Sequence, residues 1–388
     1  MESIAPLIAY NTTDYLISSR LMKQMTVERL KDSTYRRRAP FKHVPPKGLR
    51  VTFKGKTGEN RICPAFHVID SHTITFTQIN VYHAGGMGLI AEKSENIHLN
   101  GFNVRLREGS KRLVSTTADA THFCNCKGEI LVENCLFENM LDDALNIHGT
   151  YMKVSDRIDD TTLGTTLVNF QQFGYVFAQP GDEILIVKPE TLLPFCKAVV
   201  KSIEYVNDQY TLIHFDQKLP VEIKAGYGLD NITWSAALTF RNNVVRNNRA
   251  RSILLSSPGK MLIENNSFSS QMSAILLEGD LDYWYESGSV SDLTIRNNLF
   301  LDCIYGGGKG AVIWVNPHVK KEANSYYEKN IRIENNTFRH FDRNLFNGFS
   351  IDGLTIRNNT IEPSNTYPPL YPSDTPFFVT DHVTNTRF

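Results

Sequence analysis

The chain has 388 residues, a formal net charge of zero, and 41 acidic side chains against 41 basic ones. This balance argues against nucleic acid or an anionic membrane surface as the main partner. No run approaches eighteen apolar residues, so no membrane span is expected. The six cysteines are scattered and lack a Cys-x-x-Cys and histidine pattern, so a zinc site has no support and no cofactor is expected.

The first 62 residues are irregular and are expected to form an N-terminal cap or early coil region. Residues 26–31 suit one or two helical turns, and residues 49–55 suit a strand. The Arg36-Arg37-Arg38 triplet is interpreted as a solvated face. The first twenty residues lack the apolar segment of a signal peptide.

From about residue 63 a short strand pattern recurs, in which alternating apolar residues are followed by Arg or Glu and then by Asn. The clearest copies are residues 130–137, 238–245, 261–268, 293–300, 331–338 and 354–361, with weaker copies at 74–81 and 97–104. The third apolar position recurs after 23 residues in three places, from 76 to 99, 240 to 263 and 333 to 356.

A period in the twenties with strand-like alternation predicts a β-solenoid, because short strands bury their apolar faces only when similar coils stack. Leucine-rich repeats would need regular leucines and a helix in each unit, and neither is present. The fold expected is therefore all-β, a right-handed parallel β-helix formed by residues 63–149 and 232–388, with its hand set by the chirality of parallel crossovers.

The longest gap between copies, from residue 132 to 240, predicts an insertion. Residues 152–154, 166–168, 183–187, 198–205 and 210–215 alternate as strands, and Asn207-Asp208 suits a hairpin turn. Residues 150–231 are therefore expected to form a small antiparallel β-barrel inserted between two coils. It would follow directly after His148-Gly149 and form a wall beside that segment.

The segment before the barrel contains the residues with the clearest chemical potential. Asp142 and Asp143 form a doublet, and Asp119 lies 24 residues before Asp143 in a similar context. If this spacing is one coil, three carboxylates lie on two adjacent coils of one face. One protonated and one ionised carboxylate are what glycoside hydrolysis requires. Asp119 and Asp143 would repel when both are ionised, which would raise one pKa. The alternative is a polar turn whose carboxylates cap backbone amides.

Seven further residues are predicted to bind sugar. They are His148, Asn146, His122, Arg251, Glu278, Asp280 and Trp284. His122 falls one coil before Asn146, and Arg251 falls one coil after Asp143. Trp284, between Tyr283 and Tyr285, could stack on the apolar face of a sugar. Other roles stay open: hydrogen-bonded structural histidines, an ion pair for Arg251, and solvated loop carboxylates for Glu278 and Asp280. Trp314 has core parity and is expected to pack inside.

At these residues the sequence resembles the α-1,3-galactosidases of glycoside hydrolase family 110, which act on terminal α-galactosyl residues, in the blood group B trisaccharide and in linear ends. The resemblance covers the solenoid, the Asp-x-x-His-Phe strand at 119–123, the Leu-Asp-Asp-Ala-Leu-Asn-x-His-Gly segment at 141–149, and the inserted barrel. It implies an exo-acting, inverting, metal-independent hydrolase of α-galactosyl-terminated oligosaccharides or glycoconjugates, with Asp142 as general acid and Asp119 and Asp143 as general base.

An inverting pair should have its acid and base roughly 6.5–9.5 Å apart, to leave room for the attacking water. The resemblance further implies a bacterial protein that is secreted or periplasmic, and a homodimer. Family members carry a longer region before the Asp motif, so early coils are expected to be missing here.

Two alternatives remain. A polygalacturonase-like β-helix would need Asn-Thr-Asp, Gly-His-Gly and Arg-Ile-Lys motifs, whereas this chain has Thr117-Ala118-Asp119 and neither of the other two near the site. A non-catalytic galactoside-binding β-solenoid would bind the same sugar without releasing it.

Overall fold

The computed structural model describes residues 61–307, 310–319 and 325–388 in full. Within residues 1–60 it describes the backbone of β1 (Glu2–Ile4), β2 (Leu7–Tyr10), β3 (Ile17–Ser18), β4 (Met25–Lys31), β5 (Thr34–Arg37) and β6 (Arg50–Phe53). The expected helical turns at residues 26–31 are therefore wrong, because that segment is strand β4, paired with β1 and β5. The side chains of the Arg36-Arg37-Arg38 triplet lie outside the described residues.

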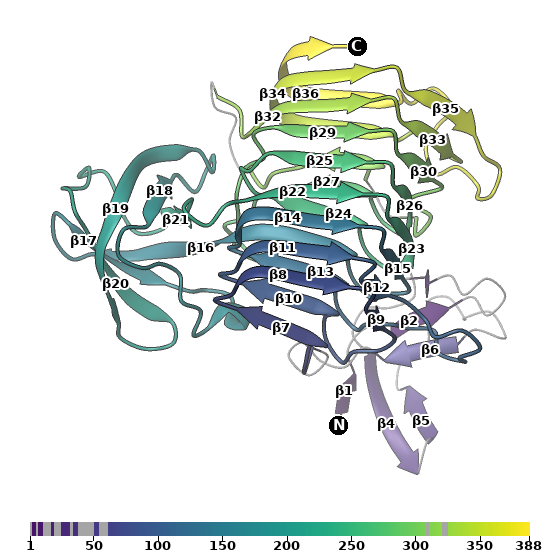
Figure 1. Ribbon diagram of the computed structural model, residues 1–388, viewed down its shortest axis with the longest axis horizontal. Helices are drawn as coiled ribbons and strands as arrows, with labels where there is room; N and C mark the ends of the chain where they lie inside the picture. Colours follow the sequence, from purple (N-terminus) through teal and green to yellow (C-terminus); the bar gives the residue numbers. More distant parts are fainter. Residues whose placement is uncertain are drawn as a thin grey trace.

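The body of the molecule is a parallel β-helix of three sheets, with coils stacked in chain order from the blue to the yellow end of Figure 1. The first sheet contains β7 (Phe66–Ile69), β10 (Leu89–Glu92), β13 (Thr121–Cys124), β16 (Leu145–Arg157), β24 (Ile253–Ser256), β27 (Ile275–Leu277), β31 (Ile313–Val315), β34 (Phe346–Arg357) and β36 (Phe378–Arg387). The second contains β8 (His72–Thr77), β11 (Glu95–Asn100), β14 (Lys127–Glu133), β22 (Ala236–Arg241), β25 (Met261–Glu264), β29 (Leu293–Arg296) and β32 (Glu328–Glu334), and ends on the later parts of β34 and β36.

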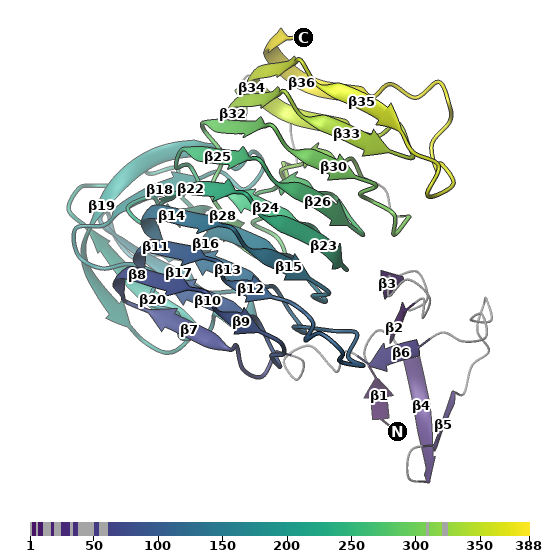
Figure 2. The ribbon, with the colours of Figure 1, turned by 45° about the vertical axis from the view of Figure 1, so that its right-hand side comes forward.

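The third sheet lies across the coil from the first two, and Figure 2 shows its strands stacked one above another from β9 to β35. It contains β9 (Asn80–Val81), β12 (Asn103–Val104), β15 (Leu136–Glu138), β23 (Val244–Asn248), β26 (Ser267–Ser270), β30 (Leu299–Leu301), β33 (Thr337–His340) and β35 (Thr360–Pro363). All pairings within it are parallel, each strand with its counterpart on the next coil. The predicted β-solenoid is confirmed.

The repeated Asn-Asn pair turns the chain between the second and third sheets. Its first member takes a left-handed backbone conformation, which Asn tolerates better than most residues, with φ of 56° at Asn242 and 57° at Asn265. Its second member stacks coil on coil, because the side-chain oxygen of Asn266 accepts the backbone N–H of Asn243 at 2.9 Å. The side-chain oxygen of Asn298 accepts that of Asn266 in the same way. Each turn thus satisfies buried backbone donors on its neighbour.

Inside the coils the apolar positions form a continuous core. Phe240, Phe268, Phe300 and Phe338 stack in one column with ring centroids 4.8 to 6.1 Å apart. All four are fully buried. Burying a side chain of this size contributes about 1.5–3 kcal/mol, so the column is a substantial part of what holds successive coils in register.

The insertion is a closed antiparallel barrel that projects from the side of the β-helix (Figure 1). Its strands are the later part of β16 with β17 (Thr162–Thr166), β18 (Glu183–Val187), β19 (Pro194–Tyr205), β20 (Tyr210–Phe215) and β21 (Gly228–Asn231). They pair in the ring β16–β17–β20–β19–β18–β21–β16 around a separate apolar core. The expected small barrel is confirmed as an element of the fold, while the domain boundaries at 62/63, 149/150 and 231/232 stay predictions.

One strand joins the two parts. The first four residues of β16 pair in parallel with β13 and β24, Gly149 and Thr150 pair with β28 (Glu286–Ser287), and Tyr151 to Lys153 pair with β21 of the barrel. A Cβ at Gly149 would lie 2.3 Å from the Ser287 hydroxyl oxygen, so only glycine fits where β28 crosses. The barrel is therefore fixed to the coil that carries the Asp doublet. None of the helical segments in the described parts of the chain could span a membrane.

Candidate active site

The three carboxylates lie where the chain enters the first sheet, on consecutive coils. Thr121 pairs with Leu145, and Leu145 pairs with Ile253, so the residues two positions earlier, Asp119, Asp143 and Arg251, form one column. The backbone N–H of Asp143 donates to Oδ1 of Asp119 at 3.3 Å, and the backbone N–H of Arg251 donates to Oδ1 of Asp143 at 2.7 Å.

Asp119, Asp142 and Asp143 are each no more than 8% exposed, and one oxygen of each lies within 4.8 Å of the others. All three line a single cavity of about 530 Å³ that opens toward the loop carrying Trp284. These nearest-oxygen distances are shorter than the spacing of roughly 6.5–9.5 Å expected between the carboxyl groups of an inverting pair. The close approach is tolerated because arginine side chains offset the repulsion.

Arg61 and Arg249 hold Asp142 from two sides. Arg61 Nη2 donates to Oδ2 of Asp142 at 2.8 Å, and Arg249 Nη2 donates to its Oδ1 at 3.1 Å. Two guanidinium groups favour the ionised form of this carboxyl. Neither arginine was among the predicted site residues. Arg249 lies two positions before Arg251, which is a signal the sequence offered, whereas Arg61 precedes the first coil and has no repeat neighbour.

Asp143 is in a different electrostatic situation. Burial raises its pKa well above the usual value, and the neighbouring Asp119 and Asp142 raise it further, although Arg251 opposes the shift with a guanidinium contact of 2.9 Å. The expected rise of one pKa within the group therefore falls on Asp143. Burial thus favours the protonated form of Asp143, while the contacts with Arg61 and Arg249 favour the ionised form of Asp142.

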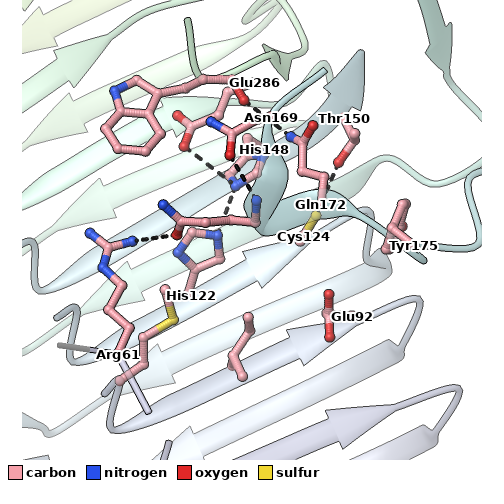
Figure 3. A pocket seen from close by; sticks show the side chains of 14 residues that line it. Arg61, Glu92, His122, Cys124, His148, Thr150, Asn169, Gln172, Tyr175 and Glu286 are labelled. Atoms are coloured by element: carbon pink, nitrogen blue, oxygen red, sulfur yellow. Dashed lines mark hydrogen bonds and ion pairs between the residues drawn. The ribbon is translucent and has the colours of Figure 1, made fainter. Parts of the chain in front are cut away.

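Two histidines continue from Asp119 along the outer face of the first sheet. Nδ1 of His122 lies 2.7 Å from Oδ2 of Asp119, and Nε2 of His122 lies 2.7 Å from Nε2 of His148. The two rings meet edge to face, and Oε1 of Glu286 lies 3.7 Å from Nε2 of His148. Figure 3 shows His122, His148 and Glu286 among the side chains that line the adjoining cavity. The predicted sugar ligands His122 and His148 are thus both engaged with protein groups.

Asn146 and Arg251 line the cavity, and each has one buried polar atom without a hydrogen-bond partner. The Asn146 side-chain N–H donates to Oε1 of Glu286 at 3.3 Å, but its Oδ1 is buried without a hydrogen-bond partner. Nε of Arg251 is buried and unpartnered as well. Buried polar atoms in this state cost about 1–3 kcal/mol each, so a ligand that satisfied them would gain that contribution.

On the opposite wall Glu278 and Asp280 are gathered by His318. Nε2 of His318 lies 2.5 Å from Oε1 of Glu278, and its Nδ1 lies 3.3 Å from Asp282 and 3.6 Å from Asp280. Hydrogen bonds to Asp280 and Glu278 raise the pKa of His318 to about 11, so this side chain is a cation. The predicted residue set did not include His318.

The Asp280 carboxylate mainly supports the loop that follows it. It accepts the backbone N–H groups of Asp282 at 2.6 Å, Tyr283 at 3.0 Å and Trp284 at 2.5 Å. Burial opposes the ionised form, but the hydrogen bonds from His318 and the loop outweigh it and lower the pKa of Asp280. Asp280 therefore stabilises the loop conformation, and both of its carboxylate oxygens already accept hydrogen bonds from the loop.

Aromatic and apolar side chains complete the cavity. Trp284 is 40% exposed and lines it together with Tyr283. The barrel holds this loop, because Gln172 donates to the Trp284 carbonyl oxygen at 3.1 Å and Asn169 to that of Tyr283 at 3.2 Å. The core position expected for Trp314 is wrong.

Ile313 and Val315 point into the core, and Trp314 between them points outward into the cavity. It stands in register with Leu276, which lines the same cavity.

Two family models match the chain. One described as GLAA-B beta-barrel domain II matches residues 162–227, and one described as right handed beta helix region matches residues 227–367. The second agrees with the predicted hand of the solenoid.

The chain is also similar to curated proteins. It is 33% identical to alpha-1,3-galactosidase A of Bacteroides fragilis over 333 residues, which is 85% of this chain and 54% of that protein. It is 37% identical to alpha-1,3-galactosidase B of Phocaeicola vulgatus over 347 residues, 84% of this chain and 58% of that protein. The chain thus spans little more than half the length of these relatives. A solved family 28 exopolygalacturonase of Yersinia enterocolitica aligns with 12% identity and a TM-score of 0.43 over 83% of this chain and 43% of that one, a likeness that does not bear on activity.

Proposed function

We propose that this chain is the catalytic region of an exo-acting glycoside hydrolase that releases terminal α-1,3-linked galactose. The observation that carries the proposal is the convergence of Asp119, Asp142 and Asp143 in one cavity. The names of the relatives from Bacteroides fragilis and Phocaeicola vulgatus support the sugar and the linkage.

The cavity suits a terminal sugar. Its volume of about 530 Å³ lies in the usual range for ligand sites, about 300–1,000 Å³. Oδ1 of Asn146 lacks a donor and Nε of Arg251 lacks an acceptor, and a small movement of either side chain would let a sugar hydroxyl supply it. Trp284, Trp314 and Leu276 offer apolar surface for the less polar face of a pyranose ring. Polar groups at one end and apolar surface at the other fit galactose better than a uronate, which would seek a free cationic group.

We assign the general acid to Asp142 and the general base to Asp119 and Asp143, as the resemblance to family 110 implies. The ligand-free electrostatics adds a condition to this assignment. Arg61 and Arg249 favour the ionised form of Asp142, so movement of either arginine away from it would help Asp142 to hold and donate a proton. Asp143, whose pKa burial raises, is the nearby store from which that proton can come.

We propose an inverting outcome on the resemblance alone, because the nearest oxygens are closer than an inverting pair requires. A retaining enzyme has its carboxyl groups about 5–5.5 Å apart. The anomer first released therefore decides between the two. It is read by proton NMR within minutes of mixing, before mutarotation equilibrates the product. First-formed β-galactose supports inversion, and first-formed α-galactose supports retention.

The function itself is tested with α-1,3-galactobiose. Release of free galactose supports the proposal. Binding without release would identify a galactoside-binding solenoid, and turnover of polygalacturonate alone would identify a pectin hydrolase. Supplying linear α-1,3-galactobiose and the fucosylated blood group B trisaccharide in parallel measures which glycan end the cavity prefers.

We further propose that the protein is secreted or periplasmic in a bacterium and forms a homodimer. The first proposal follows from the glycan substrate, which is an extracellular material, and the second from the resemblance to family 110. Cell fractionation and light scattering of the purified protein test them.

A further inference from the structure

His122 and His148 have a geometry that a sugar-binding role does not explain. Both side chains are nearly buried, and a continuous line of hydrogen bonds runs from Oδ2 of Asp119 through His122 to His148. The line ends on the carbonyl oxygen of Gly149, which lies 2.6 Å from Nδ1 of His148. The three contacts of 2.6 to 2.7 Å lie within hydrogen-bonding distance, and a hydrogen bond at each of them holds one hydrogen.

The number of hydrogens in these three contacts sets the combined charge of Asp119, His122 and His148. A carbonyl oxygen only accepts, so Nδ1 of His148 carries a proton. One more proton must lie between the two Nε2 atoms, and one between Nδ1 of His122 and Oδ2 of Asp119. Two neutral imidazoles and an ionised carboxylate would supply only two protons. The three groups together therefore hold one extra proton and are neutral overall.

We propose that Asp119, His122 and His148 form a proton wire that serves the base of the reaction, a role that rests on the proposed function. The extra proton can reside on Asp119, on His122 or on His148 without breaking any of the three hydrogen bonds. His122 and His148 are thus positioning residues that act through Asp119, in place of the sugar contacts predicted for them.

The wire gives Asp119 a way to accept a proton from water. As the water oxygen bonds to the anomeric carbon, its O–H bond breaks and the proton passes to Oδ1 of Asp119. In the same step the Oδ2 proton of Asp119 passes to Nδ1 of His122, and the Nε2 proton of His122 passes to Nε2 of His148. Asp119 and His122 are then neutral, and the positive charge ends on His148. Glu286, 3.7 Å from Nε2 of His148, is the counter-ion. The leaving oxygen takes its proton from Asp142, so charge balances and no further reactant is needed.

The surroundings determine where the extra proton rests while the site is empty. Burial lowers the pKa of His148, which keeps the extra proton toward Asp119 while the site is empty. Burial raises the pKa of Cys124 and of Tyr175, so these two neighbours stay uncharged. Among the charged groups that line the small cavity beside the wire, Arg61 pairs with Asp142 and Glu92 with His67. Glu286 accepts from Asn146 and is the carboxylate that faces His148.

The first test needs no activity. In the ligand-free protein labelled with 15N-histidine, we expect strongly downfield imidazole protons for His122, and loss of these signals in His122→Gln. In Asp119→Asn, where the first hydrogen bond no longer holds the extra proton, we expect the His148 15N shifts to move as well. Two histidines that titrate independently near their ordinary pKa, unaffected by Asp119→Asn, would overturn the wire.

The second test is kinetic and uses His148→Ala, which leaves Asp119 and the sugar-facing wall intact. Because general-base assistance contributes about 10²–10⁴-fold, we expect kcat on α-1,3-galactobiose to fall by about tenfold or more with KM unchanged. Added imidazole, admitted by the adjoining cavity of about 110 Å³, should restore part of kcat in a saturable way. A raised KM with wild-type kcat would make His148 a sugar ligand and refute the proposal.

His340→Ala is the matched control. His340 is equally buried and its ring also contacts protein oxygens, with Nε2 donating to the Cys303 carbonyl oxygen at 2.7 Å, but it lies outside the candidate site. This variant should lose stability without a selective loss of kcat or a response to imidazole. If wild type releases no galactose at all, the proposed function fails, while the NMR test of the wire still gives its own answer.

Discussion

The buried contact between Arg251 and Asp143 makes the free energy of unfolding depend on pH, and the direction of that dependence follows from the pKa of Asp143. Arg251→Met removes the guanidinium that lies 2.9 Å from Oδ2 of Asp143, but keeps the backbone N–H that donates to Oδ1. Breaking one partner of a buried ion pair costs about 3–5 kcal/mol when the other charge is left uncompensated. Asp143 can escape most of that cost by taking up a proton, since its pKa is already raised by burial.

The size of the effect should therefore change with pH. A carboxyl whose folded-state pKa is raised contributes its full stability below the unfolded-state pKa, and loses it as pH rises through the folded-state value. Removing Arg251 raises the folded-state pKa of Asp143 further, so the added loss appears as pH rises through the wild-type folded-state pKa of Asp143. Near pH 5 we expect a loss of about 1.5–3 kcal/mol, the worth of a hydrogen bond to a charged group. At pH 8 we expect about 3–5 kcal/mol.

The assay is thermal unfolding at pH 5 and pH 8 at one scan rate, with Arg296→Met as control. Arg296 makes a similar contact with Glu264, at 2.7 Å, but on the outer face, where both side chains are partly exposed. Such surface pairs contribute about 0–1 kcal/mol, so the control should barely shift Tm at either pH. An Arg251→Met shift in Tm that is equal at the two pH values, or no larger than that of the control, would refute the reasoning.

Three further predictions concern the chemistry. Asp142→Asn should abolish turnover with circular dichroism unchanged, and wild-type rates in this variant would exclude it as the acid. Asp119→Asn and Asp143→Asn should each lower kcat by about 10²-fold or more, as loss of a positioned acid or base does, measured as galactose release. Trp284→Ala should raise KM by about 3- to 10-fold through loss of stacking worth about 0.5–1.5 kcal/mol, and a phenylalanine in its place should recover most of it.

Much of the fold could be predicted from sequence because it is repetitive. Each copy of the pattern corresponds to an equivalent strand on a successive coil, so one weak copy does not change the prediction. The Asn that follows each second-sheet strand marks the turn. The column of Asp119, Asp143 and Arg251 was predictable for the same reason: it needs only the coil spacing around β13, β16 and β24.

The residues that sequence reasoning missed enter the site from outside the repeat. Arg61 lies before the first coil and His318 after the last residue of β31, in segments without a periodic neighbour to set their direction. Trp314 was assigned to the wrong face because β31 has only three residues between two long loops. So short a strand does not show from its alternation of apolar and polar residues which side chains point inward. The contact between His122 and His148 depends on the rotamers of both side chains, which the repeat spacing of the sequence does not determine.

The order in which the site's charges are synthesised has a consequence for how the protein reaches its native state. Asp142 and Asp143 leave the ribosome more than a hundred residues before Arg249 and Arg251, two arginines that contact them, whereas Arg61, a further partner of Asp142, is made earlier. During that interval Asp119, Asp142 and Asp143 lack Arg249 and Arg251 as partners, and repulsion among those carboxyls that are ionised opposes tight closure of the newest coil. Tight packing of the coil that carries the Asp doublet therefore waits until the barrel and the coil after it, which supplies Arg249 and Arg251, have been synthesised.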